Sequence, residues 1–541
     1  MGKMGKVGLS LLSAFILGAC GGESMEAVEE QVLNLAEDAD IDSMDTTVPT
    51  DGVSFNTMNN VFEGLLGYDL EGTLIPTGAS DFPEESDDKL VYTFVIREDA
   101  NWSNGDPVTA ADYVFAWQKI VDPVNAAGYA YLFDGIVKNA TAIINSEMDK
   151  SELGVRAIDE KTLEVTLEQP IPYFLDLLAM PFYFPQNQEY VEEQGDQYAQ
   201  DSEHLLYNGP FQLDDWTAAQ GGSWSYVKND DYWDEEAVQL DRINWQVLKE
   251  TSTGINLYDS GELDRTELTG SYVQQYQDNA ELKTRFQSTI YYLELNQAVP
   301  ELANENIRKA FTMAIDNESF TKNVLQDGSE AIYGHVPSGL SKNPVTGADF
   351  REDAGDVTAY DLEAAQAAWA QGLEELGTDT IALELITSDT EDSKVLSEYV
   401  QSQLQTNLPG LMITVQQLPA NSRLSKVKAG EYQMATATWG ADFADPINYV
   451  ERFDTDINRA NYSYADVDAL IDLSREQYAD AEARWETLME VEQVALGEHY
   501  AHIPVYQAAE VYLEKDYVKD TFRPMFGSDS YKYAYLEEGA K

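Results

Sequence analysis

The histidine and cysteine side chains that could carry out chemistry are few in this chain of 541 residues. It has four histidines and one cysteine, beside 97 acidic residues. His499 and His502 are three positions apart, a spacing that on one helix would place both imidazoles on the same face, where they could share a metal ion. An ordinary pair at the end of a helix explains the same spacing, and we expect no metal site. His204 and His335 have no recognisable partner in the sequence.

The motifs of several enzyme classes are missing from the sequence. It contains no Gly-x-Ser-x-Gly nucleophile elbow, no Gly-x-x-x-x-Gly-Lys phosphate loop and no His-Glu-x-x-His zinc motif. A single cysteine allows neither an internal disulfide nor a cysteine-based zinc site. A glycosidase with two carboxylates stays open because its acids need no fixed spacing, although no pattern supports it. We therefore predict a protein that is not an enzyme, has no catalytic residues and needs no cofactor.

The single cysteine, Cys20, ends an N-terminal segment that is typical of exported proteins. Two lysines precede the apolar run Val7–Ala19, which is shorter than the roughly 20 residues of a membrane-spanning helix. The sequence Leu17–Cys20 resembles a bacterial lipobox, whose cysteine receives a diacylglyceryl group; the alternative is a chance cysteine in a signal peptide. We predict a lipoprotein signal peptide at 1–19 and a tether at 20–33. The protein would be extracytoplasmic, anchored by lipid alone to the membrane of a Gram-positive cell.

The acidic residues dominate the electrostatics of the chain. With 97 Asp and Glu against 33 Lys and Arg, the net charge is −64. Such a field repels nucleic acid and anionic lipid, so we expect no nucleic-acid partner. Dispersed carboxylates keep a protein hydrated where salt screens their repulsion, which favours a salty or alkaline habitat; plain solubility is the alternative. At 43% hydrophobic residues the chain can bury large cores, and its length predicts roughly two to four lobes.

Hydrophobic periodicity predicts alternating strands and helices. Strands are expected at 91–97, 162–167, within 282–296, and at 381–386, 412–416, 433–439 and 503–506. Helices are expected from a capping box at Thr109 and Asp112 through Trp117, and at 306–314, 362–376, about 393–406, 467–473 and 481–496. The strand–helix–strand order of 381–416 predicts a mixed α/β lobe. We expect Trp102 and Trp117 to lie in a core.

Short motifs follow one another along most of the chain. They are Phe62–Leu65, Tyr92–Arg97 with Trp102–Ala110 and Phe115–Trp117, Asn208–Phe211, Asp231–Asp234, Gly261–Asp264, Ile307–Phe311 with Ala314–Asp316, Trp439–Pro446 and Ile503–Tyr506. Each motif is weak alone. Together, in this order and spacing, they resemble the family 5 extracellular solute-binding proteins, and most closely the oligopeptide-binding lipoproteins of ABC importers.

The resemblance implies an α/β fold of the type II periplasmic-binding-protein kind, with two mixed α/β lobes, an extra domain and a ligand cleft between the lobes. Lobe I would comprise 34–62, 188–285 and 508–541, domain II 63–187, and lobe III 286–507. An oligopeptide would lie between lobe III and lobe I, and hinge closure would follow its binding. The loaded protein would dock on an ABC permease served by separate ATPase subunits. Lone subunits are usual in such systems, so we expect a monomer.

The strand that ends near residue 440 is the expected ligand contact. Its small residues Ala435, Ala437 and Gly440 let another backbone approach closely. In similar proteins this strand edge, here Thr438 to Gly440, pairs with the main chain of the bound peptide, which is β-augmentation. Backbone hydrogen bonds ignore side-chain identity, so affinity can coexist with broad sequence tolerance.

The same resemblance assigns side chains to the ligand. Asp442 would hold the α-ammonium of the peptide; a cap or turn carboxylate is the alternative. Trp439 would form an aromatic wall near the first peptide side chain, with a core position as the alternative. Gly52 and Val53 align with a family segment that offers main-chain contacts, and Tyr129 aligns near a tyrosine from the other side of the cleft.

One position departs from the enterobacterial pattern. Thr436 stands where an arginine that helps to meet peptide carboxylates is expected, so the site could accept longer peptides whose ends protrude. Other ligands of the family stay open as alternatives, namely a nickel chelate, an oligosaccharide or a signalling peptide. From another class, a surface chaperone, adhesin or sensor would use the cleft without transport.

Overall fold

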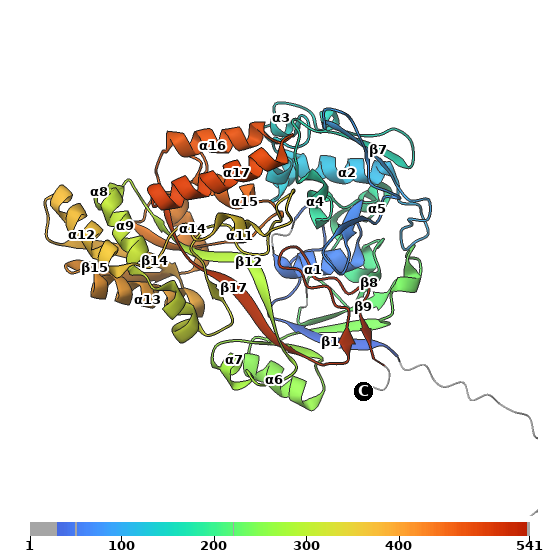
Figure 1. The fold of residues 1–541 in the computed structure, drawn as a ribbon. Helices are drawn as coiled ribbons and strands as arrows, with labels where there is room; N and C mark the ends of the chain where they lie inside the picture. The colour runs from blue at the N-terminus through green and yellow to red at the C-terminus, as the bar shows by residue number, and fades with distance from the viewer. Residues whose placement is uncertain (1–29, 49–50, 220, 538–541) are drawn as a thin grey trace, which may run out of the picture. The chain divides into compact units, whose positions relative to one another are not determined.

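The computed structural model describes residues 30–48, 51–219 and 221–537, so the predicted signal peptide, Cys20 and most of the predicted tether lie outside the described residues. Residues Gln31–Lys541 form one compact unit. Its described part carries two four-stranded sheets and one seven-stranded sheet, with helices around them (Figure 1). No helix within these described ranges is both long enough and apolar enough to cross a membrane.

The first four-stranded sheet brings the start of the described chain beside residues 211–247. Its order is β1 (Val32–Glu37), β10 (Arg242–Val247), β9 (Ser223–Lys228) and β8 (Phe211–Asp214), with β1 parallel to β10 and the other neighbours antiparallel. Leu33 and Leu35 are buried because alternate side chains of a strand share one face. Helix α1 (Gly52–Val61) packs Met58 into the same core.

The second four-stranded sheet confirms the predicted strand–helix unit. Its order is β4 (Glu84–Glu85), β5 (Val91–Val95), β7 (Thr162–Thr166) and β6 (Val155–Ala157), all antiparallel. Helix α2 (Ala110–Val121) begins with the predicted capping box, in which the Thr109 N–H donates to the Asp112 carboxylate over 2.8 Å. Trp102 and Trp117 are buried in this core, as predicted.

The seven-stranded sheet is mixed. Its order is β11 (Arg265–Leu268), β17 (His502–Glu514), β12 (Leu282–Leu295), β16 (Met434–Trp439), β14 (Ile381–Ser388) and β15 (Leu411–Leu418), with β13 (Glu330–Ala331) also paired to β17. The neighbours β16, β14 and β15 are parallel and the other pairs antiparallel. Helix α13 (Glu391–Asn407) connects β14 to β15, so the predicted strand–helix–strand unit is confirmed. Helices α9 (Glu305–Ala314) and α12 (Leu362–Leu376) share its core.

The remaining helices and strands are mostly short. They are α3 (Ala140–Ile144), α4 (Phe174–Leu177), α5 (Gln188–Gln194), α6 (Thr251–Ser260), α7 (Ser271–Gln275), α8 (Pro300–Ala303), α10 (Asn317–Ser319), α11 (Phe350–Ala354), α14 (Ala420–Lys428), α15 (Ile447–Val450), α16 (Ala465–Glu476), α17 (Ala481–Glu492), and the strand pairs β2 (Leu66–Tyr68) with β3 (Leu74–Pro76) and β18 (Val518–Lys519) with β19 (Tyr535–Leu536).

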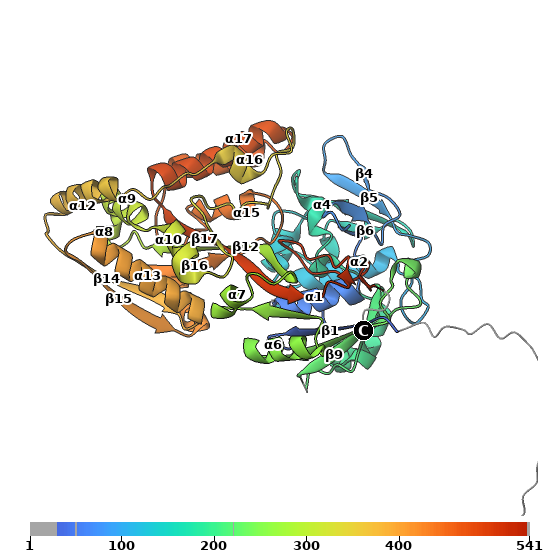
Figure 2. The same cartoon turned by 60° about the horizontal axis from the view of Figure 1, so that its bottom comes forward.

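The two long strands β12 and β17 run side by side (Figure 2). Phe286 pairs with Ala509 and Ile290 with Gln507, so Gln287–Thr289 oppose a single residue of β17. This irregularity is a β-bulge, which bends a strand and re-aims its side chains. The predicted boundaries 285/286 and 507/508 fall at this bulge, inside continuous strands; the division into lobes stays a prediction.

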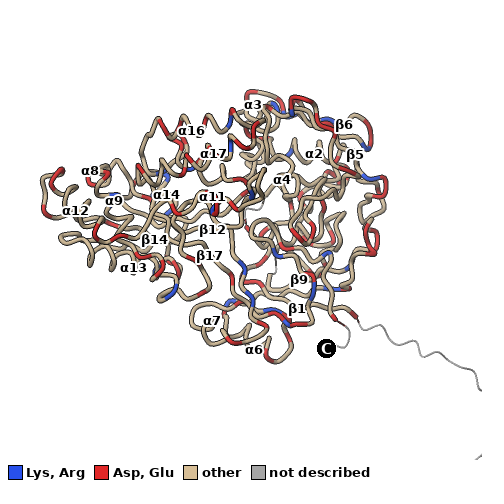
Figure 3. The backbone as a smooth tube through the Cα atoms, in the orientation of Figure 1, with Lys and Arg blue, Asp and Glu red and all other residues tan. Residues whose placement is uncertain are grey.

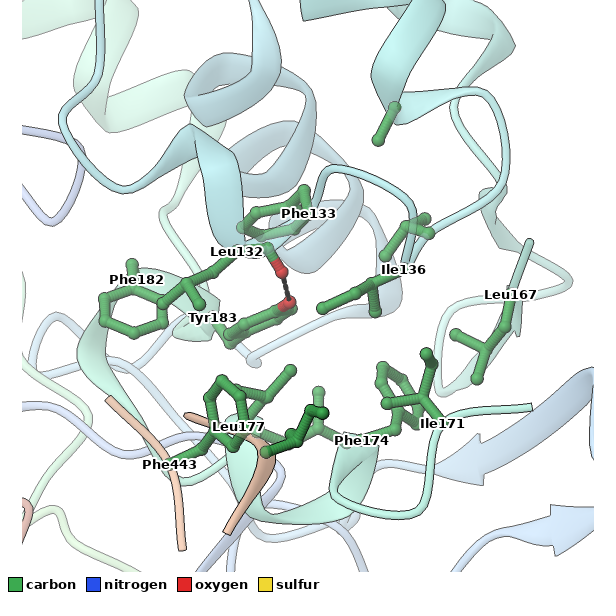
Figure 4. Packing of buried hydrophobic residues seen from close by; sticks show 14 of the residues in the cluster. Leu132, Phe133, Ile136, Leu167, Ile171, Phe174, Leu177, Phe182, Tyr183 and Phe443 are labelled. Atoms are coloured by element: carbon green, nitrogen blue, oxygen red, sulfur yellow. Dashed lines mark hydrogen bonds between the residues drawn. The ribbon is translucent and has the colours of Figure 1, made fainter. Parts of the chain in front are cut away.

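One hydrophobic core contains residues from both predicted domain II and predicted lobe III. Figure 4 shows Phe443 beside Leu177 of α4, with Phe174 and Tyr183 nearby. The hydroxyl of Tyr183 donates to the Leu132 carbonyl over 2.7 Å, which satisfies the one polar atom of this ring. The segment that follows Asp442 is therefore fixed by packing.

The expectation that His499 and His502 form a pair at the end of one helix is wrong. A π-helical turn follows α17 at Gln493–Glu498. The strand that was predicted from Ile503 begins one residue earlier, at His502. His499 lies in the connection, with its Nε2 atom 2.9 Å from an Asp466 carboxylate oxygen. His502 is buried, and neither of its ring nitrogens has a hydrogen-bond partner in the described structure. Among the described residues no group of three or more His, Cys, Asp and Glu could hold a metal ion.

Candidate functional site

A cavity of about 430 Å³ lies at the bulge of β12. Its wall is formed by Gly52, Phe55 and Asn56 of α1, Tyr129, Met180–Phe182, Arg285 and Gln287–Thr289 of β12, Gly440–Asp442, and Pro524–Asp529. These segments come from all three predicted domains. A ligand in this cavity would therefore contact all three predicted domains.

The end of β16 that leads into this cavity has one edge without a neighbouring strand. On one side β16 pairs with β12 along its whole length, whereas on the other it pairs with β14 only at Met434 and Ala435. Within the described residues no strand continues this second edge beyond Ala435, and Thr438 is exposed there. Such an edge can receive an extended chain as an additional strand.

Thr436 contributes no charge to this edge. Its side chain is buried, with its hydroxyl oxygen 2.9 Å from that of Thr387, and its carbonyl accepts a hydrogen bond from Arg423 over 2.7 Å. The position that departs from the enterobacterial pattern is therefore part of the interior of the sheet.

Asp442 is the acidic residue that follows β16 in the cavity wall. Burial raises the pKa of its carboxyl group above the ordinary value, while hydrogen bonds with Tyr131 and Asn448 and the charge of Arg452 act in the opposite direction. No Lys or Arg of the described residues forms an ion pair with it. A partly buried carboxylate without a counter-ion can accept a cationic group from a ligand.

Aromatic rings line the cavity beside Asp442. Tyr129 stacks on Phe182 with ring centroids 4.8 Å apart and meets Phe55 edge-on at 5.3 Å. It also stacks on Tyr131, at 5.6 Å. Burial, with the nearby charge of Asp442, raises the pKa of Tyr129 to about 12. These rings give the cavity an apolar wall close to its acid.

The other end of the cavity carries paired charges. Arg285 donates to Asp529 over 2.7 Å and to Glu510, and Arg523 also binds both carboxylates. These arginines hold the pKa of Asp529 far below its ordinary value. Because each charge has a partner, this end is less available to a ligand ion than Asp442 is. Elsewhere acidic residues are spread along the described part of the chain and do not gather at one place there (Figure 3).

The structure brings together four of the predicted ligand-binding residues. Gly52, Tyr129, Gly440 and Asp442 line the cavity. Val53 packs against the core of the first sheet, and Thr438 lies on β16 outside the cavity wall. The indole N–H of Trp439 donates to the Asn448 carbonyl over 2.9 Å, and the Arg452 guanidinium lies 4.0 Å from its ring centroid. The ligand-binding roles of all seven residues stay predictions.

Sequence reasoning missed two parts of this site. Tyr131, two residues after Tyr129, is the tyrosine that hydrogen-bonds Asp442; the repeated Tyr-x-Tyr pattern was the only signal for it. The bulge Gln287–Thr289 also lines the cavity, and the Ser288 hydroxyl accepts the N–H of Ala441 over 3.1 Å. A polar run inside a predicted strand was its only sequence signal.

The chain belongs to the bacterial extracellular solute-binding proteins, family 5, whose middle region matches residues 73–461. It is 31% identical over 547 residues to the dipeptide-binding protein DppE of Bacillus subtilis, with 98% of both chains covered. It is 34% identical over 466 residues to a dipeptide-binding protein of Lactococcus lactis subsp. cremoris, with 83% of both chains covered.

Solved structures give the same result for the fold. Listeria monocytogenes OppA bound to peptide is 42% identical, with a TM-score of 0.78 over 94% of this chain and 99% of that chain. The pheromone receptor PrgZ, a structure that describes its mode of peptide binding, is 35% identical, with a TM-score of 0.79 over 94% and 100%. The fold is therefore the mixed α/β fold of these solute-binding proteins, and the family and these relatives are binding proteins.

Proposed function

We propose that this chain captures oligopeptides outside the cytoplasm and delivers them to an ABC permease for import. The peptide main chain would extend the free edge of β16 at Thr438 to Gly440, and Asp442 would hold the α-ammonium. The observation that supports this most is the position of Asp442: a carboxylate without a counter-ion, in a cavity, directly after an unpaired strand edge.

The cargo can be identified directly. Native mass spectrometry of the purified protein would detect co-purified ligands, and we expect masses of short peptides with mixed sequences. Calorimetry with a tetrapeptide would then compare its free amino terminus with the N-acetylated form. Tighter binding of the free form supports the proposal, whereas a nickel chelate, an oligosaccharide or no amine preference contradicts it.

Membrane attachment and transport are separate parts of the proposal. Lipid on Cys20 would keep a monomeric binding protein near a permease that draws energy from separate ATPase subunits. We expect Cys20→Ser to release the protein into the medium and to reduce peptide uptake by intact cells, while the purified variant binds peptide normally. Retention of Cys20→Ser in the membrane fraction would contradict the anchor, and unchanged uptake would contradict the role of tethering in delivery.

A further inference from the structure

Asn448 lies directly behind the segment that carries Trp439 and Asp442. It belongs to α15, its side chain is 1% exposed, and it does not line the cavity. Its amide oxygen accepts the main-chain N–H of Asp442 and the indole N–H of Trp439, both over 3.1 Å. Its side chain also lowers the pKa of the Asp442 carboxyl group, against the effect of burial, which raises it.

These contacts use the whole amide group. An asparagine amide offers one oxygen with two lone pairs and one NH₂ donor. The oxygen receives two N–H groups, and the Asn448 side chain lowers the pKa of the Asp442 carboxyl group, as expected where an NH₂ group faces a carboxylate. A carboxylate at position 448 could accept the same two N–H groups but could donate nothing. An apolar side chain of the same size could do neither.

Helix α15, which carries Asn448, is held in place from two sides. The Asp445 carboxylate accepts the Ile447 N–H over 2.9 Å and binds the Arg484 guanidinium through both oxygens, over 2.7 and 2.8 Å. Tyr449 donates its hydroxyl to the Ser288 carbonyl in the bulge of β12. Because α15 is fixed by a buried ion pair and by the bulge, the amide of Asn448 has a defined place relative to both structures.

We propose that Asn448 is the positioning residue of the ammonium site: its amide orients the Asp442 carboxylate toward the cavity, while Trp439 is held mainly by the main-chain carbonyl of Asn448. This inference rests on the proposed function, because it assigns Asn448 an effect only through Asp442. Donation to a carboxylate favours its charged form. Loss of the amide would therefore leave the acid less well oriented and more easily protonated.

The test uses two variants and two ligands. Asn448→Leu removes both accepting and donating contacts, and Asn448→Asp keeps the shape and the accepting oxygens but places a second acid beside Asp442. Calorimetry would measure a tetrapeptide with a free amino terminus and the same peptide N-acetylated. We expect Asn448→Leu to weaken the free peptide by about tenfold or more, as for loss of a hydrogen bond to a charged group, and to leave the acetylated peptide unchanged.

The pH profile separates positioning from simple loss of stability. Between pH 4 and 7 the affinity for the free peptide should fall as Asp442 becomes protonated, and we expect the midpoint in Asn448→Asp to lie at least about one pH unit higher than in the wild type. In Asp442→Asn, the further change Asn448→Leu should cost no additional affinity. Asn296→Leu is the matched control: this buried amide donates to the Gly430 and Tyr432 carbonyls, away from the cavity. It should lower stability without changing the amine preference.

The outcomes are distinguishable. Equal binding of free and acetylated peptide by the wild type would overturn the proposed role of Asp442. If the wild type prefers the free amine but Asn448→Leu keeps that preference, or Asn448→Asp keeps the wild-type midpoint, Asn448 is only a structural residue and the inference is wrong. Should Asn448→Leu fail to fold, the shape-preserving Asn448→Asp decides alone.

Discussion

The rings of Tyr173 and Phe443 stack face to face, with centroids 4.0 Å apart and planes within 7° of each other. Tyr173 precedes α4 in predicted domain II, and Phe443 directly follows Asp442 in predicted lobe III. The residue next to the candidate ammonium-binding acid is thus packed against the opposite part of the structure. The contact between the predicted lobes and the predicted contact with a ligand therefore share one segment of chain.

Removing the ring of Phe443 from this stack should favour a form in which the predicted lobes lie further apart. Replacing a buried phenylalanine with alanine costs about 3–5 kcal/mol of packing, and in Phe443→Ala this loss falls on the contact between the lobes. We expect a larger radius of gyration by small-angle X-ray scattering without ligand, and weaker peptide binding by calorimetry. Phe311→Ala, in the core of the seven-stranded sheet, should lower Tm without changing the radius. An unchanged radius in Phe443→Ala would exclude a role in closure.

Removal of the candidate ammonium-binding acid should nearly abolish binding. Asp442→Ala would leave the peptide's ammonium buried and unpaired, which costs about 3–5 kcal/mol, or two to four decades in Kd. Calorimetry with a tetrapeptide measures this loss. Asp99→Ala, at a largely exposed side chain, changes the net charge equally and should bind normally. A loss of less than about tenfold in Asp442→Ala would mean that this carboxyl serves only as a cap.

The buried histidines should make the protein sensitive to acid. Burial lowers the pKa of His335, and lowers that of His502 to about 3, whereas both take the ordinary value near 6.5 in the unfolded chain. The unfolded state therefore binds more protons below pH 6.5, so the free energy of unfolding falls as pH decreases from about 6.5 toward 3. The slope is up to about 1.4 kcal/mol per pH unit for each histidine.

Urea unfolding at several pH values measures this effect. The nitrogens of both rings lack hydrogen-bond partners among the described residues, and both rings pack against Tyr292 and Phe453. His502→Phe should therefore fold, and its stability should depend less steeply on pH than that of the wild type. Equal slopes would mean that His502 is protonated in the folded protein.

Salt should stabilise the protein. Acidic side chains spread over the chain repel one another at a net charge of −64 (Figure 3), and the Debye length shrinks from about 10 Å at 0.1 M salt to about 3 Å at 1 M. We expect Tm to rise as sodium chloride increases over this range. A Tm that is indifferent to ionic strength would reject adaptation to a salty habitat.

Peptide length should have little influence on affinity beyond four residues. The Thr436 side chain is buried against Thr387 and brings no cation to the strand edge, so a peptide's carboxyl end has no charged partner from that position. Calorimetry with one sequence extended from two to six residues measures the length dependence. A sharp optimum at dipeptides or tripeptides would contradict this expectation.

Local pattern was enough to predict many of the longer elements, such as α12 and β14, because hydrophobic alternation, capping residues and turn residues act over short distances. Strand β17 shows where this fails: it was expected at 503–506 but continues to Glu514. Its later acids resemble a solvent-exposed segment in sequence, whereas Glu510 binds Arg285 and Arg523, and Glu514 binds Lys283. Arg285 and Lys283 lie more than 200 residues from these acids in the chain, and partners at such separations cannot be inferred from spacing.

The resemblance named four residues of the candidate site, Gly52, Tyr129, Gly440 and Asp442, which line the cavity. The order of residues placed Asp442 after a strand of small residues, and the structure places both beside a cavity. Tyr131 lies in a distant segment of the chain, whereas Asn448 lies six residues after Asp442 and meets it because the chain turns into α15. The hydrophobic periodicity of a sequence gives no information about such contacts.

The bulge at Gln287–Thr289 belongs at once to the cavity wall and to β12, which pairs with β17 where the predicted lobes meet. A peptide bound as proposed would contact these three residues and so act directly on the strands that connect the predicted lobes. In the proposed transport role, the angle between the predicted lobes would then tell a permease whether the cavity is occupied, whatever the side chains of the bound peptide.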